Sequence, residues 1–221
     1  MTDRPQDRGA RMTETLTSPQ TLLRRILLMP PAAPRLLIGL SGAPGSGKST
    51  LAEWITRQLN RQEDQAVAVP MDGFHLDNIL LEQRGLMSRK GAAETFDAQG
   101  FVHALNRLTR EPTVLLPEFD RAADLSRAAA IEVAPRHRIA VVEGNYLSSS
   151  APPWCDAHPL WALRIHLEVP RDTLRTRLIR RWRDHGLSAE DARARAEGND
   201  MVNVDHMAAT LTPPDILYRP E

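Results

Sequence analysis

The chain has 221 residues, and its 28 basic and 28 acidic residues give a formal net charge of zero at pH 7. This length fits one α/β domain with a sizeable core, and the charge balance gives no support to a general nucleic-acid or acidic-membrane partner. A single cysteine, Cys155, excludes an intramolecular disulfide and favours a reducing compartment, and the absence of a long apolar run argues against a membrane span or a secretory signal, so we expect a cytoplasmic protein.

The N-terminal part of the chain predicts a mobile segment, a helix and then the first core strand. Residues 1–17 are polar and are expected to be mobile, whereas residues 18–221 are expected to form one domain. Residues 21–29 have the apolar spacing of a short helix that ends at a group of prolines. An apolar strand over 35–41 is followed by helical apolar spacing over 50–61.

A phosphate-binding loop joins this strand to this helix. The segment Gly-Ala-Pro-Gly-Ser-Gly-Lys-Ser matches G-x-x-x-x-G-K-[ST], in which glycines let backbone N–H groups point at phosphate oxygens. The following helix adds its positive N-terminal end. Lys48 would reach the β/γ-phosphates and Ser49 would bind Mg²⁺. The alternative is a glycine-rich turn with an incidental lysine. The residues assigned to the nucleotide here are Gly42, Ala43, Pro44, Gly45, Ser46, Gly47, Lys48, Ser49 and Thr50.

An aspartate follows the second predicted strand, which covers 66–70. Asp72 lies just beyond the carboxyl end of that strand, where ligands bind in open parallel sheets. One crossover after Lys48, such a carboxylate would face the γ-phosphate and accept a proton from an attacking hydroxyl. The alternative is a turn aspartate before Gly73. Residues 76–97 are predicted to be irregular or weakly helical.

The middle of the chain predicts a helix over 98–110, a short strand over 113–116 and a loop over 117–121. Residues 138–142 are a continuous apolar run, which is typical of a buried parallel strand. Glu143 ends this strand. Because a buried glutamate without a partner is costly, we expect Mg²⁺ or a basic neighbour beside it; a solvated strand end is the alternative.

The C-terminal part continues the alternation of strands and helices. Residues 162–168 predict a strand, 171–185 a helix, Ser188 the start of another helix, 199–210 a last helix and 216–218 a short strand. This alternation predicts an α/β fold in three layers with a parallel sheet core.

Arginines gather on the helix 171–185. Arg177, Arg180 and Arg181 are three and four positions apart, so at least two of them share a face. As part of a moving lid over about residues 171–200, this face would clamp a triphosphate, although a solvated helix with an Arg180–Asp184 pair is the alternative. Lysine is rare in this chain: Lys48 and Lys90 are the only two, which marks Lys90 as a candidate site residue or a chance survivor.

The order of motifs between residues 37 and 183 resembles one group of kinases. The phosphate loop is followed by Asp-Gly-Phe-His, Lys-Gly-x-x-Glu-Thr-Phe-Asp, Pro-x-Phe-Asp-Arg, Val-Val-Glu-Gly-Asn-Tyr and an arginine-rich lid. This order is similar to the P-loop kinases that include uridine kinase, phosphoribulokinase and bacterial pantothenate kinase. Residues 71–78 and 143–146 are most similar to bacterial proteins named fructose transport system kinases. The resemblance implies a P-loop nucleoside triphosphate hydrolase fold with a helical lid, bound ATP and Mg²⁺, and transfer of the γ-phosphoryl group to a small-molecule hydroxyl.

The resemblance also implies roles for particular residues. Asp72 corresponds to the catalytic base, and Asp97 to a residue that contacts acceptor hydroxyls. Arg177 and Arg180 correspond to lid arginines on the phosphates, and Lys48, Asp72 and Arg177 are the expected catalytic set. Ser49 and Glu143 are the expected metal ligands. The candidate substrate-binding residues are Asp72, His75, Lys90, Asp97, Phe119, Arg121, Glu143 and Tyr146. For His75, packing within a loop is an equal alternative.

The acceptor is expected to be a sugar such as fructose. Phe119 stands where uridine kinases have a tyrosine, which argues against a nucleoside. A pantothenate- or nucleoside-type kinase, a nucleotide-dependent switch or transport ATPase and a non-catalytic regulatory module remain alternatives. The motifs Asn-Lys-x-Asp and Leu-Ser-Gly-Gly-Gln are missing, so the sequence supports neither a GTPase nor an ABC subunit. The sequence is compatible with a homodimer but does not specify one.

Overall fold

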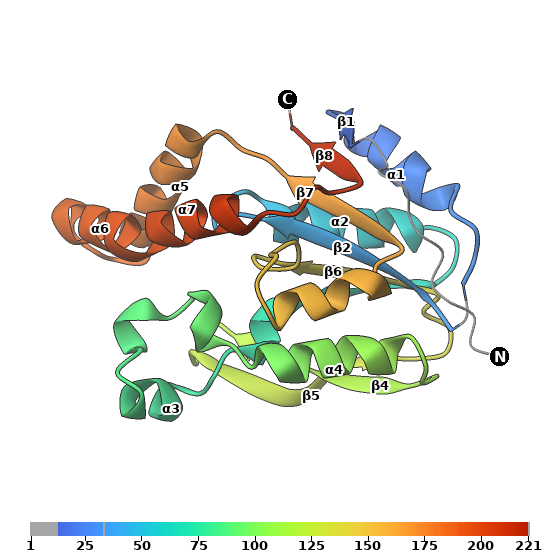
Figure 1. Ribbon diagram of the computed structural model, residues 1–221, viewed down its shortest axis with the longest axis horizontal. Helices are drawn as coiled ribbons and strands as arrows, with labels where there is room; N and C mark the ends of the chain where they lie inside the picture. Colours follow the sequence, from blue (N-terminus) through green and yellow to red (C-terminus); the bar gives the residue numbers. More distant parts are fainter. Residues whose placement is uncertain (1–12, 33, 221) are drawn as a thin grey trace.

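The computed structural model describes residues 13–32 and 34–220, and its core is one parallel sheet (Figure 1). Six strands lie in the order β1-β8-β7-β2-β6-β3, and all of their pairings are parallel. The strands are β1 (Glu14–Leu16), β2 (Leu36–Gly42), β3 (Ala66–Pro70), β6 (Ile139–Gly144), β7 (Leu163–Leu167) and β8 (Ile216–Tyr218). The phosphate loop follows β2. This strand lies inside the sheet, with β6 and β3 to one side and β7, β8 and β1 to the other.

Helices cover both faces of the sheet, which confirms the predicted three layers (Figure 1). One face packs on α1 (Pro19–Leu27) and α2 (Lys48–Leu59), and the other on α4 (Ala98–Leu108) and the 3₁₀ segment Trp154–Leu160. Neighbouring side chains of a strand point to opposite faces. Leu36, Ile38 and Leu40 accordingly join the core with α1 and α2, whereas Leu37 joins the core with α4.

The N-terminal segment that was expected to be mobile lies only partly within the described residues. Residues 1–12 of the segment expected to be mobile lie outside the described residues. Glu14–Leu16, by contrast, form the edge strand β1, which pairs with β8. Leu16 is buried and packs in the core with α1 and α2, so this short strand is held by its apolar last residue as well as by its backbone.

A β-hairpin lies below α4, and the sequence predicted only its first half (Figure 1). Its strands are β4 (Val114–Asp120) and β5 (Leu125–Val133), paired antiparallel. The expected loop over 117–121 is wrong because β4 continues through Pro117: the pairing shifts register between Leu116 and Glu118, and this bulge accommodates the proline. β5 is mostly exposed and lacks an apolar alternation, so its sequence carries no strand signal.

The segment predicted to be a lid, about residues 171–200, forms with α7 (Met201–Thr210) one helical unit at the carboxyl end of the sheet, called the lid helices below. This unit comprises α5 (Arg171–Asp184), α6 (Ala189–Arg195), a π-helical turn (Ala196–Asp200) and α7. Ser188 caps α6 by accepting a hydrogen bond from the Asp191 N–H, as its spacing predicted. A small apolar cluster of Leu174, Leu178, Ala196, Met201 and Val204 holds the helices together.

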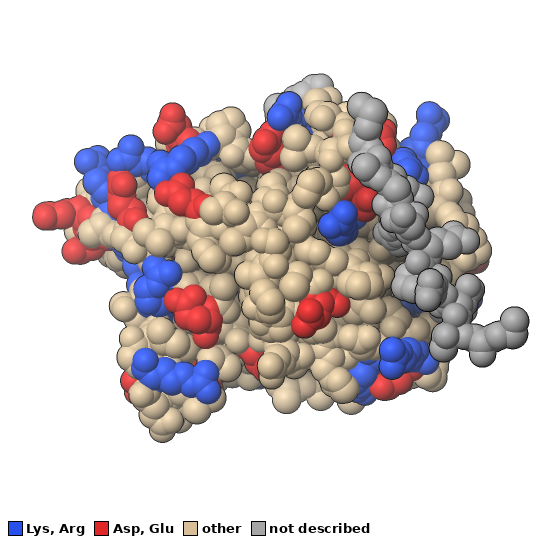
Figure 2. Space-filling model, in the orientation of Figure 1, with Lys and Arg blue, Asp and Glu red and all other residues tan. Residues whose placement is uncertain are grey.

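Charges of both signs are interspersed on α5 and α6, and Figure 2 shows no large surface of one sign on the visible face. Two further helical segments, α3 (Asn78–Gln83) and the 3₁₀ turn Met87–Arg89, fall in the region that the sequence predicted to be irregular or weakly helical. Among the described residues, no helix combines the length and the apolar character that crossing a bilayer requires.

Candidate functional site

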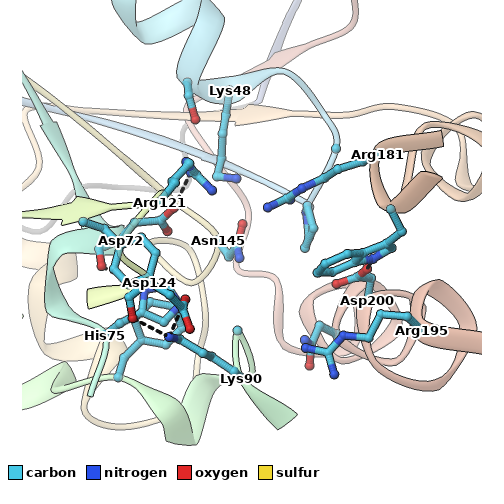
Figure 3. Close-up of a pocket in the computed structure, with 18 of the residues that line it drawn as sticks. Lys48, Asp72, His75, Lys90, Arg121, Asp124, Asn145, Arg181, Arg195 and Asp200 are labelled. Atoms are coloured by element: carbon cyan, nitrogen blue, oxygen red, sulfur yellow. Dashed lines mark hydrogen bonds and ion pairs between the residues drawn. The ribbon is translucent and has the colours of Figure 1, made fainter. Parts of the chain in front are cut away.

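A cavity of about 580 Å³ lies at the carboxyl ends of β2, β6 and β3, with the lid helices on its opposite side (Figure 3). This is the edge where parallel sheets bind ligands. Four parts of the chain line it. They are the phosphate loop (Pro44, Gly45, Gly47, Lys48, Ser49 and Thr50), the segment from β3 to α4 (Asp72, His75, Met87, Lys90, Gly91 and Phe96), the hairpin tip with Asn145 (Phe119, Arg121, Asp124 and Asn145) and the lid (Arg181, Trp182, Leu187, Arg195, Asp200 and Asn203).

The phosphate loop has the backbone conformation that its glycines permit. Gly45 and Gly47 have φ angles of 77° and 94°, in the left-handed region that side chains disfavour. The loop closes by a hydrogen bond of 3.1 Å from the Ser46 N–H to the Ala43 carbonyl, and α2 begins at Lys48. The N-terminus of α2 and the side chain of Lys48 therefore supply positive charge to the same part of the cavity.

Beside this loop, Glu143 is buried near the end of strand β6, the neighbour of β2. Its register partners are Leu40 on β2 and Pro70 on β3, and only 5% of it is exposed. Ser49 Oγ donates to Glu143 Oε1 over 3.0 Å, while Oε2 is buried without a partner among the described residues. Burial raises the pKa of Glu143, and the nearby charge of Lys48 partly opposes that rise.

The residues present fit a Mg²⁺ ion. The unpartnered carboxylate oxygen of Glu143 and the hydroxyl of Ser49 are the oxygen donors that Mg²⁺ prefers. Within the described ranges no group of three or more His, Cys, Asp or Glu residues could hold a metal by itself. That is consistent with a magnesium ion bound mainly through nucleotide phosphates and waters, with only one or two protein ligands.

Asp72 faces the cavity from a 3₁₀ turn, Met71–Phe74, that follows β3. Its Oδ2 accepts a hydrogen bond of 2.7 Å from Arg121 Nη2, so that the two side chains form an ion pair (Figure 3). The turn is packed tightly against β4, because a Cβ atom on Gly73 would lie 2.3 Å from the Pro117 carbonyl oxygen. Glycine at this position therefore lets the hairpin approach and fixes where Asp72 points.

His75 and Lys90 also line the cavity, and both are engaged by the protein. The His75 ring lies between Phe96 and Phe119, with ring centroids 4.0 and 4.7 Å away. Its Nδ1 donates to the Asp72 carbonyl over 2.8 Å, and burial lowers its pKa. Lys90 Nζ lies 2.7 Å from Asp124 Oδ1 and 5.0 Å from the Phe119 ring centroid.

Three expected substrate contacts do not line the cavity: Glu143, described above, Asp97 and Tyr146. Asp97 is instead the N-cap of α4, where its Oδ1 accepts from the Gly100 N–H over 2.8 Å. Tyr146 is a core residue with 1% exposure, and its hydroxyl donates to the Gly91 carbonyl over 2.8 Å. Asp97 and Tyr146 are next to cavity-lining residues in the sequence, but their side chains form hydrogen bonds with backbone groups.

The lid arginines differ from expectation in which of them reach the cavity. Arg177 Nη1 donates to the carbonyls of Gly45 and Ser46 over 3.2 Å each, and it braces the phosphate loop from outside. Arg180 is 83% exposed and lies near Asp184, as the alternative reading held. Neither of them lines the cavity.

Arg181 and Arg195 line the cavity instead, and both guanidinium groups lie over the Trp182 ring. In Figure 3 the side chain of Arg181 points toward the amino group of Lys48. Arg181 belongs to the arginine set that the sequence singled out on α5. Arg195 was missed, because it lies on α6 and only the packing of α6 against α5 brings it to the cavity.

Other residues of the cavity were also missed, among them Asn145, Asp200 and Asp124. Asn145 projects into its centre, and its buried Oδ1 has no partner among the described residues (Figure 3). It directly follows Glu143-Gly144, and that position was its only sequence signal. Asp200 accepts a hydrogen bond of 2.5 Å from Trp182 Nε1, and burial raises its pKa. No sequence pattern indicated Asp124, because only the first strand of its hairpin was predicted.

Known proteins resemble this chain in sequence and in structure. The family model described as KAP family P-loop domain matches residues 20–189. A candidate uridine kinase of Schizosaccharomyces pombe is 36% identical over 84% of this chain and 83% of its own length. The crystal structure of a candidate fructose transport system kinase from Silicibacter sp. TM1040 is 48% identical, covers 91% of this chain and 98% of its own, and superposes with a TM-score of 0.87. Pantothenate kinase of Vibrio cholerae is 28% identical over 68% of this chain and 49% of its own length.

Proposed function

Because this chain belongs to the P-loop kinases, which phosphorylate alcohol groups of small molecules, we propose that it transfers the γ-phosphoryl group of ATP, bound with Mg²⁺, to a sugar or a related polyol. One observation carries the proposal: Lys48 of the phosphate loop and the carboxylate of Asp72 line the same cavity. Lys48 follows strand β2 and Asp72 follows strand β3. The cavity that both side chains line has room for a small alcohol.

In this proposal the phosphate loop binds the triphosphate. Its backbone N–H groups and Lys48 Nζ contact the phosphate oxygens, and Arg181 meets them from the lid side. Ser49 and Glu143 would hold Mg²⁺, which supplies positive charge to the β- and γ-phosphates when it is bound. Arg177 acts indirectly, by holding the carbonyls of Gly45 and Ser46.

Asp72 accepts the proton of the acceptor hydroxyl as its oxygen forms a bond to the γ-phosphorus. The bond from that phosphorus to the β–γ bridging oxygen breaks, and ADP leaves with the electron pair. Asn145 has an unpartnered amide oxygen in the cavity and would accept a hydrogen bond from a second hydroxyl of a polyol.

We also propose that residues 18–221 act as one kinase domain and that about residues 171–200 close over the bound substrates. Trp182 and Leu187 bring apolar surface to the cavity from this segment, and Arg181 and Arg195 bring charge. Closure would exclude water, which otherwise competes with the alcohol for the phosphoryl group.

A pantothenate-type acceptor is the second candidate. The 28% identity to the Vibrio pantothenate kinase favours it, but this chain spans only about half of that protein. A nucleoside acceptor has less support, because the aromatic residue at position 119 is phenylalanine and offers no hydroxyl to a base.

The test is a phosphoryl-transfer screen with ATP against sugars, polyols, pantothenate and nucleosides, read by the mass shift of the acceptor. We expect transfer to a sugar or polyol and slow ATP hydrolysis when no acceptor is present. Asp72→Asn should lower kcat by about 10²- to 10⁴-fold with unchanged ATP binding. Asp77→Asn is the matched control, because Asp77 caps α3 and asparagine caps equally well. Near-complete activity of Asp72→Asn would contradict the role of this residue as base.

A further inference from the structure

The proposed base is paired with a neighbouring cation through one of its two oxygens. Arg121 Nη2 donates to Asp72 Oδ2 over 2.7 Å, so the guanidinium occupies an oxygen that would accept the proton of the acceptor hydroxyl (Figure 3). Arg121 comes from the end of the β4–β5 hairpin, and 60% of its side chain is exposed. Exposed pairs contribute only about 0–1 kcal/mol, so a competing anion can separate this one.

The other cations of the cavity are less available to an acceptor. Lys90 Nζ, whose side chain is 12% exposed, already contacts Asp124 Oδ1 at 2.7 Å and Asn78 Oδ1 at 2.6 Å. Lys48 belongs to the phosphate loop, and Arg181 points toward it in Figure 3.

Arg195 is held at the far side of the cavity, where its Nη1 donates to the Ser88 carbonyl over 2.9 Å. Arg121 differs from all of these cations. Within the described part of the chain, Asp72 is its only hydrogen-bonded partner, and that partner is the proposed base, which accepts a proton more readily once the cation moves away.

We propose that the acceptor carries an acidic group, a phosphate or a carboxylate, in addition to the hydroxyl that receives the phosphoryl group, and that Arg121 binds this acidic group. This inference rests on the proposed function. The anion draws Arg121 from Asp72 and leaves the carboxylate free for the hydroxyl of the same molecule. Phe96 and Phe119 line the same cavity as Arg121 and give the carbon skeleton an apolar surface. A guanidinium is suited to this task, because its donors match two oxygens of one anion.

The first experiment measures binding and does not require the true acceptor. The full-length protein is saturated with Mg·ADP, so that the nucleotide phosphate sites are filled. D-glucose, D-gluconate and D-glucose 6-phosphate are then titrated by calorimetry, as are glycerol, D-glycerate and glycerol 3-phosphate. We expect at least one anion of each series to bind about 10- to 100-fold more tightly than its neutral parent, as charge-assisted hydrogen bonds require. The carboxylate and phosphate members distinguish the two kinds of anion.

The variant Arg121→Gln should remove this preference, and Arg127→Gln is its matched control. Arg127 is on the same hairpin and is similarly exposed, at 64%. It pairs with Asp120 in the same way, but it does not line the cavity. Equal binding of charged and neutral members, no binding of any anion, or a preference that survives Arg121→Gln would each overturn the inference.

Phosphoryl-transfer assays distinguish a failure of this inference from a failure of the proposed kinase function. Transfer to a neutral sugar with an efficiency equal to that of its phosphate or acid would leave the kinase assignment intact and reject the anionic acceptor. Transfer to none of the acceptors in the screen, with ATP still bound, would reject the kinase proposal itself. If Arg121→Gln raises the KM for ATP and lowers kcat equally for all acceptors, Arg121 serves the nucleotide and the inference fails.

Discussion

The carboxylate of Glu143 shows how one residue can be unfavourable for the empty fold and useful for a ligand. It lies near the end of a strand in which every residue is buried, and one of its oxygens has no partner among the described residues. Because burial raises its pKa above the ordinary value of 4.5, the folded protein resists its ionisation. The stability that comes from the neutral form is present at low pH and is lost as the pH rises through the raised pKa.

Glu143→Gln should therefore stabilise the ligand-free protein at neutral pH by about 1 kcal/mol, or about 2–4 °C in melting temperature for a chain of this size. The gain should shrink as the pH falls toward 4.5, where the wild-type side chain is also neutral. The stabilisation by Mg·ATP should be smaller in the variant than in the wild type. Thermal unfolding at several pH values, with and without Mg·ATP, measures both effects, and a gain that is independent of pH would contradict the argument.

At the scale of the elements, the position of each arginine around the axis of α5 decides whether it reaches the phosphate loop and the cavity or points to solvent. Arg177 and Arg181 are four positions apart and both face the phosphate loop, one against its backbone carbonyls and one into the cavity. Arg180 points to solvent. The spacing of the three was visible in the sequence, but the face that packs on the loop is set by Leu174 and Leu178 in the apolar cluster of the lid.

We expect Arg181→Gln to lower kcat/KM for ATP-dependent transfer by on the order of 100-fold, as for the loss of one charged donor to a transferring phosphoryl group. Arg180→Gln should remain within about twofold of the wild type, because an exposed pair contributes little. Steady-state kinetics of the two variants, measured side by side, test the assignment. The reverse order of effects would mean that the lid uses its outer face when it closes.

At the scale of the whole molecule, the side chain of Arg35 connects segments that are far apart in the sequence. It is 3% exposed and lies just before β2, at the end of the sheet opposite the cavity. Its guanidinium donates to four backbone carbonyls at distances of 2.8–3.2 Å. These belong to Leu108 and Glu111 at the end of α4, Pro112 before β4, and His137 before β6. One side chain thus joins three connections that are far apart in the sequence.

Arg35→Met should lower stability by about 3 kcal/mol or more, since several buried carbonyls would lose their donors, and the melting temperature by about 6 °C or more. Arg35→Lys should fall between this variant and the wild type. At low temperature kcat should be unchanged, because the length of β2 separates Arg35 from the cavity. Arg138→Met is the control, because Arg138 is exposed at the start of β6. A melting temperature equal to that of the control would refute the role of Arg35.

The sequence by itself determined the elements whose signal is local. The phosphate loop, the strands that lead to Asp72 and Glu143, and the capped start of α6 follow from patterns of a few neighbouring residues, and all of them are present in the structure. Hydrophobic period, glycine conformation and cap geometry act over such short distances. The parallel sheet followed from the same signals, because alternating strands and helices can be packed in few ways.

Only the tertiary structure decided which side chains share the cavity. Asp97 and Tyr146 are within two residues of cavity-lining positions in the chain, yet they serve a helix cap and the core. Arg195 reaches the cavity because α6 packs on α5, and Arg121 reaches Asp72 because the hairpin packs on Gly73. Contacts between segments this far apart depend on the way whole elements pack, and that information is spread over the buried surfaces of both partners rather than held in either local pattern.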